Sequence, residues 1–160
     1  MPVEIERKFR VMKDKTPWDA ATDWLDIVQG YICTEPRRTV RIRSVVLKNG
    51  WSRGYITIKG ETTWYSRPEF EYSIPYDNAT DMLNLMCDSK ISKRRYIVME
   101  GDDEWHVDVF DSDNKGLVTA EIELEHPEQY FYQPSWLGAE ITDDPRYANS
   151  NLSIKPYSTW

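Results

Sequence analysis

Charged and apolar residues alternate along short segments of the chain, starting at residue 3. The first segment, residues 3–11, has the sequence VEIERKFRV, with Glu4, Glu6 and Lys8 two positions apart. Because successive side chains of a β-strand point to opposite faces, this spacing places two carboxylates and one ammonium group on one face. Most of the intervening positions are apolar. The segment therefore predicts a strand with one charged face and one apolar face.

The same alternation recurs in seven further segments, and turn residues separate several of them. The pair Asn49-Gly50, for example, is typical of a two-residue hairpin turn. The predicted strands are residues 3–11, 27–34, 39–47, 54–59, 67–74, 91–99, 104–110 and 117–125. Short strands joined by tight turns indicate an antiparallel sheet, and eight strands can close into a barrel.

Three helices are predicted between or after these strands. A Thr-Pro pair at the start of residues 17–24 is typical of a helix N-terminus. Asp77 is expected to cap an amphipathic helix that extends to about residue 87. Asp144, followed by a proline, is expected to cap a closing helix that runs towards residue 152. The fold class is thus mainly β (α+β), a barrel with a few flanking helices.

Composition narrows the class of protein. The chain has 160 residues, of which 40% are hydrophobic and 29% charged, and this indicates one globular domain over residues 1–160. A net charge of -7 argues against nonspecific binding to nucleic acid. No apolar run approaches the roughly 20 residues of a membrane span, and the charged first strand does not resemble a signal peptide. With Cys33 and Cys87 interpreted as free thiols, we expect a cytoplasmic protein without a membrane partner.

The charged faces carry same-sign pairs two positions apart. These pairs are Glu4 with Glu6, Arg41 with Arg43, Glu69 with Glu71, Lys93 with Arg95, and Glu121 with Glu123. In an ordinary small barrel the apolar face points inward and the charges point to solvent. Like charges side by side in solvent are mildly unfavourable, however, and have no reason to recur. We therefore predict that the charged faces point into the barrel, and that helices or a homodimer interface cover the apolar outer face.

A single ligand would account for both sets of charges. Basic side chains two apart on a strand suit a phosphate group, whose oxygens arginine binds in a bidentate manner. Paired carboxylates suit a hard divalent cation, which also binds phosphate oxygens. His106 and His126 are isolated and do not form a zinc site. The pattern therefore indicates a polyvalent phosphate with a metal ion inside the barrel.

In their order along the chain, these motifs resemble those of the CYTH superfamily, the triphosphate tunnel metalloenzymes. The similar motifs are E-x-E-x-K at residues 4–8, R-x-R at 41–43, I-T-I-K at 56–59, E-x-E at 69–71, K-x-R at 93–95 and E-x-E at 121–123. Segments 29–31 (QGY) and 136–142 (WLGAEIT) also resemble the family. The resemblance covers nearly the whole chain and implies an eight-stranded antiparallel β-barrel with a charged tunnel.

The resemblance also implies an activity, the hydrolysis of a triphosphate with Mg²⁺ or Mn²⁺, and bacterial chains of this length most often resemble inorganic triphosphatases. The metal ligands that it implies are Glu4, Glu6 and Glu123, assisted by Glu121 or Asp108. The side chains that would hold the triphosphate are Lys8, Arg41, Arg43, Lys59, Lys93 and Arg95. The residues expected near the reacting phosphorus are Lys8 and Tyr31 paired with Lys93. The attacking water would be oriented by a second metal ion or by a carboxylate such as Glu69 or Glu71. An ordinary packed strand tyrosine is the open alternative for Tyr31.

Two other functions fit the same motifs. The first is the activity of a class IV adenylate cyclase or of a thiamine triphosphatase, with the same fold and a triphosphate substrate. The other is that of a non-catalytic module that binds polyphosphate or a nucleotide. The complete set of carboxylates argues against the binding module, because binding an anion requires only the basic residues.

Overall fold

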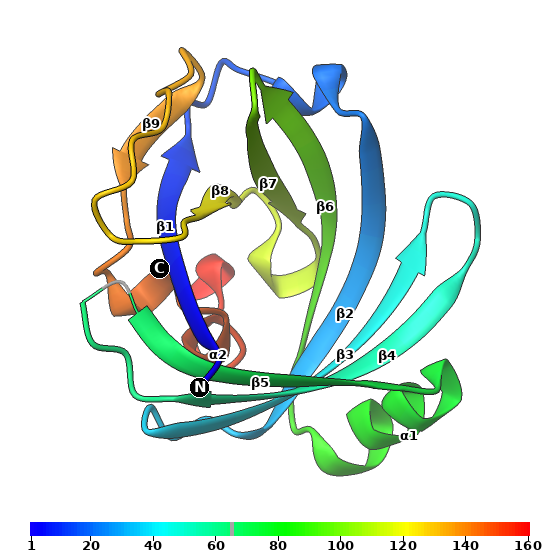
Figure 1. Ribbon diagram of the computed structural model, residues 1–160. Coiled ribbons are helices and arrows are strands. Elements are labelled where there is room, and N and C mark those ends of the chain that lie inside the picture. The colour runs from blue at the N-terminus through cyan, green and yellow to red at the C-terminus, as the bar shows by residue number, and fades with distance from the viewer. Residues whose placement is uncertain (65) are drawn as a thin grey trace.

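The strands of the protein form one closed sheet. The structure, a computed structural model, describes residues 1–64 and 66–160. Its strands are β1 (Val3–Val11), β2 (Asp23–Cys33), β3 (Arg38–Leu47), β4 (Ser52–Gly60), β5 (Ser66–Ile74), β6 (Lys90–Glu100), β7 (Asp103–Phe110), β8 (Val118–Glu123) and β9 (Leu137–Glu140). The order is β5-β4-β3-β2-β6-β7-β8-β1, and β1 pairs with β5 to close the barrel (Figure 1). The predicted eight-stranded antiparallel barrel is confirmed.

The ninth strand, β9, lies outside the closed barrel, and the alternation pattern does not predict it. One edge of β1 pairs with β8, whereas the other edge pairs first with β5 and then, near Phe9 and Val11, with β9. Gly138 permits this approach, since a Cβ there would lie 2.9 Å from the backbone oxygen of Arg10. Four residues that include a glycine carry too little alternation to identify a strand from sequence.

Two of the predicted helices are wrong in extent. Residues 17–24 do not form a helix: Pro17–Ala20 makes one 3₁₀ turn and β2 begins at residue 23. Trp24 pairs with Tyr96 of β6, so strand pairing overrides the local helix signal. The closing helix is divided into a 3₁₀ turn at Pro145–Tyr147 and the short α2 (Asn149–Leu152), because the backbone between them is extended.

The helix α1 (Tyr76–Met86) covers the outer face of β3 and β4 (Figure 1). Asp77 lies in its first turn and not at the cap, which is Pro75, so the predicted cap is wrong. Ala79 and Leu83 are buried against the outward-pointing Ile42 of β3. The amphipathic pattern of this helix thus serves to cover the barrel.

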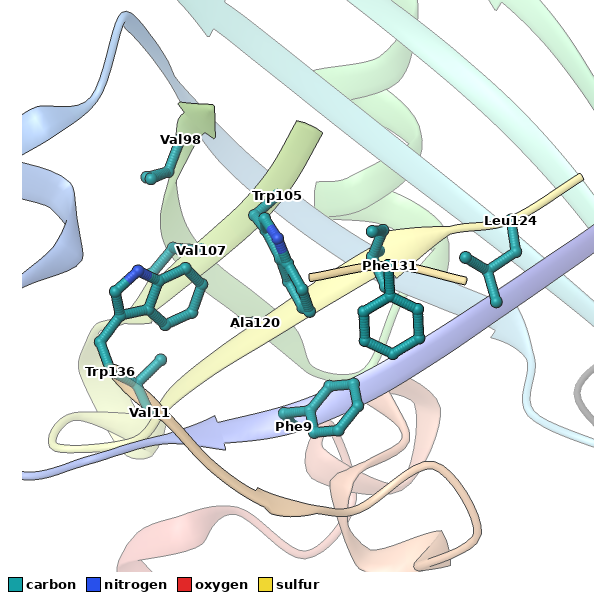
Figure 2. Close-up of a cluster of buried hydrophobic side chains, with 10 residues drawn as sticks. Phe9, Val11, Val98, Trp105, Val107, Ala120, Leu124, Phe131 and Trp136 are labelled. Atoms are coloured by element: carbon teal, nitrogen blue, oxygen red, sulfur yellow. The ribbon is translucent and has the colours of Figure 1, made fainter. Parts of the chain in front are cut away.

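A second apolar cluster covers the outer faces of β1, β7 and β8 (Figure 2). Trp105 of β7 is fully buried at its centre, with Phe9, Phe131 and Trp136 at ring-centroid distances of 5.8, 5.7 and 5.4 Å. Phe131 and Trp136 come from the segment between β8 and β9. The outward orientation of the apolar faces is therefore confirmed, and much of their cover comes from a segment without regular structure.

The C-terminal segment fills one part of the barrel interior. Ile91 and Phe110 share the inner strand faces with Lys93 and Asp108, since they lie two positions away on the same strands. Ile91 and Phe110 pack with Tyr147 and Leu152 in a buried apolar cluster. None of the helices formed by the described residues has the length and apolar character that crossing a lipid bilayer requires.

Candidate functional site

The inner faces of the strands line a cavity of about 580 Å³. The predicted site residues in its wall are Glu4, Glu6, Lys8, Arg41, Arg43, Lys59, Glu69, Glu71, Arg95, Glu121 and Glu123. They come from β1, β3, β4, β5, β6 and β8, so residues distant in sequence meet because the barrel is closed. The prediction that the charged faces converge on a shared interior is confirmed.

A second cavity, also of about 580 Å³, adjoins the first and shares Glu4, Glu6, Lys8, Arg41 and Lys59 with it. It extends past the inner face of β2 to the C-terminal segment. Tyr31 lines this second cavity and not the first. The two cavities together form the charged interior of the barrel.

The register of the strands explains why like charges recur along each strand. Lys8 lies opposite Glu121, Lys59 opposite Glu69, and Arg95 opposite Asp108. At these three positions opposite charges face each other across neighbouring strands, and such cross-strand pairs stabilise a sheet. Glu6, in contrast, lies opposite Glu123, so two carboxylates face each other there. The closed barrel therefore neutralises some members of the same-sign pairs and leaves others without an opposite charge on the neighbouring strand.

Asp108 organises the most buried part of this network. Its carboxylate accepts hydrogen bonds from Lys93 Nζ at 2.6 Å and from Arg95 Nε at 2.7 Å. Burial alone would raise the pKa of Asp108, but Arg95 and Lys93 hold it well below its ordinary value. Lys93 and Asp108 are 2% and 1% exposed and lie behind the cavity wall, where Arg95 links them to the cavity and to Glu121.

Among the described residues, two carboxylates of the acidic part of the wall, Glu6 and Glu123, form no ion pair with a cationic side chain. Glu4 binds Lys59 at 2.6 Å, but Glu6 has no hydrogen bond or ion pair with any described residue. Burial, together with the neighbouring Glu121 and Glu4, raises the pKa of Glu6 to about 7. The Glu6 carboxylate is therefore placed where a cation would be favourable.

This donor set suits a hard divalent cation, which prefers several carboxylate oxygens. Within the described residues, however, no three His, Cys, Asp or Glu side chains are already arranged around a common metal position. Glu4 and Glu121 form ion pairs with Lys59 and Arg95. A metal ion at Glu6 would therefore compete with these bases for the other two carboxylates.

The two arginines of β3 have different partners. Arg41 donates to Thr57 Oγ1 at 3.0 Å and lies 3.4 Å from Glu71. Among the described residues, Arg43 donates only to a neutral group, the side-chain oxygen of Gln29, at 3.0 and 2.7 Å. Burial, with Arg41 and Arg95 nearby, lowers the pKa of Arg43 to about 9, so its charge persists at neutral pH but lacks a carboxylate partner among the described residues.

Tyr31 and Lys93, expected to pair, have other partners in this structure. The Tyr31 hydroxyl oxygen accepts a hydrogen bond from Gln29 Nε2 at 3.1 Å. Lys93 Nζ donates to Asp108 and, at 3.2 Å, to Asn149. No hydrogen bond joins Tyr31 to Lys93 among the residues that the structure describes.

Three neutral side chains in the site were not predicted. Gln29 and Thr57 are fully buried and hold Arg43 and Arg41, respectively. The period of two along β2 and β4 places both on inner faces, so this signal could have identified them. Asn149 reaches Lys93 from α2, and nothing in the sequence indicates that contact. His106 also lines the first cavity, with Nδ1 3.4 Å from Arg95.

The barrel with its charged interior defines a class of protein, and sequence comparison agrees with it. The family model of the CYTH domain matches residues 2–153, so the chain belongs to the CYTH family. A curated relative, the inorganic triphosphatase of Acetivibrio thermocellus, is 40% identical over 161 residues that cover 100% of this chain and 99% of the relative. The inorganic triphosphatase of Nitrosomonas europaea is 30% identical over 154 residues, covering 94% and 97%.

Solved structures show the same fold. A crystal structure of an inorganic triphosphatase has a TM-score of 0.64 and 27% identity, covering 94% of this chain and 97% of that chain. A Hippeastrum protein described as an adenylyl cyclase with a dominant triphosphatase activity has a TM-score of 0.58, covering 78% and 81%. At 11% identity, this second likeness shows the fold alone.

Proposed function

We propose that the chain is a metal-dependent hydrolase of inorganic triphosphate that acts in the cytoplasm. The observation that carries the proposal is the convergence of Lys8, Arg41 and Arg43 on a cavity that also contains the unpaired carboxylate of Glu6. Cations in an enclosed site favour a polyanion, and a carboxylate among them favours a divalent metal over a simple anion site. The activity in the names of the two curated relatives supports the same substrate.

The basic side chains of the wall would bind and orient the triphosphate. Lys8 and Arg43 lack a carboxylate within hydrogen-bonding distance among the described residues, and the Lys8–Glu121 contact is 3.7 Å. Burial lowers the pKa of Lys8, but Glu121 and Glu6 outweigh it and raise the value, so the ammonium group is charged at neutral pH. The other cations of the proposed binding site are Arg41, Lys59 and Arg95. Lys93 lies behind the cavity wall and would contribute through Asp108, which binds both Lys93 and Arg95.

Hydrolysis moves a phosphoryl group to water while charge spreads over its equatorial oxygens. Lys8 and Arg41 would stabilise that charge, because the barrel places both in the wall of the cavity before the reaction begins. Glu69 and Glu71 line the same cavity and would orient the attacking water. A bound Mg²⁺ or Mn²⁺ supplies Lewis-acid neutralisation of phosphate oxygens. The carboxylates proposed to hold the metal ion are Glu4, Glu6, Glu121 and Glu123. Asp108 lies behind the cavity wall and would orient Arg95.

The test is phosphate release from inorganic triphosphate, ATP and thiamine triphosphate, with and without Mg²⁺ or Mn²⁺, and with cyclic AMP measured alongside. We expect metal-dependent release of phosphate that is fastest with inorganic triphosphate. Cyclic AMP formation from ATP would favour a cyclase, and faster turnover of thiamine triphosphate would change the substrate. Binding without turnover of any triphosphate would favour the non-catalytic module.

A prediction for the metal site follows from the position of Glu4 and Glu6. Replacing either one with Gln removes a charged oxygen donor but keeps its size, so turnover should fall about 100-fold or more with the fold retained. Glu125→Gln is the matched control, because Glu125 is exposed and outside both cavities. Full turnover of the Glu4→Gln and Glu6→Gln variants would show that the metal assignment is wrong.

A further inference from the structure

Gln29 of β2 is fully buried between Arg43 and Tyr31, and the chemistry proposed above does not use it. Its side-chain oxygen lies 3.0 Å from Arg43 Nε and 2.7 Å from Arg43 Nη2. Its side-chain nitrogen lies 3.1 Å from the Tyr31 hydroxyl oxygen. One amide therefore contacts one side chain at each of the two cavities, since Arg43 lines the first and Tyr31 the second.

The chemistry of these partners determines the orientation of the amide. A guanidinium group has donors and no acceptor, so the group facing Arg43 must be the amide oxygen. The amide NH₂ then faces Tyr31 and donates to its oxygen. Because this hydrogen bond uses an acceptor site of the hydroxyl, the hydrogen of the Tyr31 hydroxyl is directed elsewhere. The second cavity, which Tyr31 lines, is the adjoining space into which it can donate.

The neutrality of the amide matters for Arg43 as well. A carboxylate in the same place would form a bidentate ion pair with the guanidinium and neutralise its charge. With an amide, Arg43 is held by two hydrogen bonds and keeps its positive charge for an anion in the cavity. A buried polar side chain that forms hydrogen bonds with two neighbouring side chains also limits the conformations of both neighbours.

We propose that Gln29 is a positioning residue for the triphosphate, which holds Arg43 and Tyr31 with their donors directed into the barrel interior. The inference rests on the proposed function and adds to it how the interior recognises the polyanion. Gln29 itself does not contact the substrate. Its contribution is that Arg43 stays charged and that Tyr31 acts as a hydrogen-bond donor.

The first test is the Gln29→Glu variant, which replaces one NH₂ group by an oxygen. The new carboxylate would neutralise Arg43 and accept the Tyr31 hydroxyl hydrogen, which reverses that hydrogen bond. We expect the dissociation constant of inorganic triphosphate, measured by calorimetry without metal, to rise about tenfold or more, the effect of one charge-assisted hydrogen bond. The Tm should stay near that of the wild type. Gln133→Glu makes the same change at an exposed position and should bind as the wild type does.

The second test is a double-mutant cycle, which remains decisive where Gln29→Glu does not fold. Gln29→Met keeps the approximate size but removes both hydrogen bonds, and it is combined with Arg43→Met. If Gln29 acts through Arg43, Gln29→Met should weaken triphosphate binding in the wild type and have much less effect beside Arg43→Met. If the role of Gln29 were purely structural, Gln29→Met would lower the Tm. It would also weaken triphosphate binding by the same factor in the wild type and in Arg43→Met.

The outcomes for the function and for Gln29 are distinct. Binding of triphosphate without metal-dependent turnover contradicts the proposed hydrolase activity alone. Unchanged affinity in Gln29→Glu, or an equal effect of Gln29→Met in both backgrounds, overturns the role of Gln29 alone. If the wild type does not bind inorganic triphosphate at all, both proposals are wrong.

Discussion

At the scale of single residues, some charged side chains in the barrel interior have partners of opposite charge and others do not. Asp108 is saturated with donors, whereas Glu6 has no close partner among the described residues. In the part of the chain that the structure describes, Arg43 forms side-chain hydrogen bonds only with the amide of Gln29. Saturated groups of this kind stabilise the wall, and the groups that lack opposite charge are available to a ligand and a metal.

The stability of the metal-free protein should depend on pH through Glu6. Its pKa of about 7 lies above the ordinary value of 4.5, so between these values the folded protein holds a proton that the unfolded chain has released. Stability contributed by this group is therefore lost as the pH rises from about 4.5 to about 7. We expect Glu6→Gln to be more stable than the wild type by about 1–3 kcal/mol at pH 8, and equally stable below about pH 4.

The measurement is urea unfolding of both proteins in metal-free buffer between pH 4 and pH 8. Addition of Mg²⁺ should then stabilise the wild type more than Glu6→Gln, because the metal binds the ionised carboxylate. Equal stability of the two proteins at pH 8 would contradict the burial of a charged Glu6.

Asp108→Asn should be strongly destabilising. The change leaves the buried Lys93 and Arg95 without their shared carboxylate, and the loss of one partner from a buried ion pair costs about 3–5 kcal/mol. Since the pKa of Asp108 is held low, this stabilisation is complete above about pH 4 and is lost as the pH falls further. Asp26→Asn, which breaks an ion pair exposed to solvent with Arg94, is the control and should cost about 0–1 kcal/mol in chemical unfolding.

At the scale of elements, the barrel has its apolar side chains outside, and separate segments must cover them. The helix α1 covers part of β3 and β4, and the segment between β8 and β9 covers β1, β7 and β8. The strands alone would expose Trp105 and its neighbours to water. The apolar side chains of both covering segments are therefore part of the hydrophobic core, although the segments lie outside the sheet. Figure 2 shows this for the segment between β8 and β9.

Phe131→Ala tests this arrangement. Phe131 is 6% exposed and contacts the rings of Phe9 and Trp105, so its truncation should lower the free energy of unfolding by about 3–5 kcal/mol. The neighbouring Tyr132 is 56% exposed, and Tyr132→Ala should cost about 0.5 kcal/mol or less. Denaturant unfolding of the two variants should separate them clearly, and similar values would show that the segment does not form part of the core.

At the scale of the whole molecule, the closed sheet concentrates charge of both signs in a protein whose net charge is -7. A polyanion bound by the interior is attracted by Lys8, Arg41 and Arg43 at short range, against the net charge of the molecule. Closure of the sheet also brings these cations around one cavity, so their attractions to the anion act together. The architecture thus allows an acidic protein to bind a triphosphate.

Inorganic triphosphate without metal should therefore stabilise the folded protein. At a concentration of about 100 times the dissociation constant, the gain is about 2.7 kcal/mol, which is a rise in Tm of about 5–10 °C for a chain of this size. Inorganic phosphate at the same ionic strength should have a smaller effect, because it makes fewer contacts with the basic side chains. Equal shifts for the two anions, measured by calorimetry, would argue against a site that spans several phosphates.

The strands could be predicted from the sequence because their alternation is local. The predicted strand at residues 3–11 coincides with β1, and the faces assigned to Arg41, Lys59 and Glu121 are those observed in the interior. The helix predicted at residues 17–24 is wrong because pairing of β2 with β6 overrides a local start signal. Strand β9 carries no pattern of its own and forms because β1 offers a free edge.

The sequence by itself determined which faces of the strands are charged, since a period of two needs only the neighbouring residues. Tertiary structure alone decided which charges neutralise each other. Asp108 is occupied by Lys93 and Arg95, and Tyr31 is joined to Gln29 rather than to Lys93. These pairings depend on strand register, on closure of the sheet and on a C-terminal segment that enters the interior, and they connect residues whose distance in space is not encoded in any local pattern.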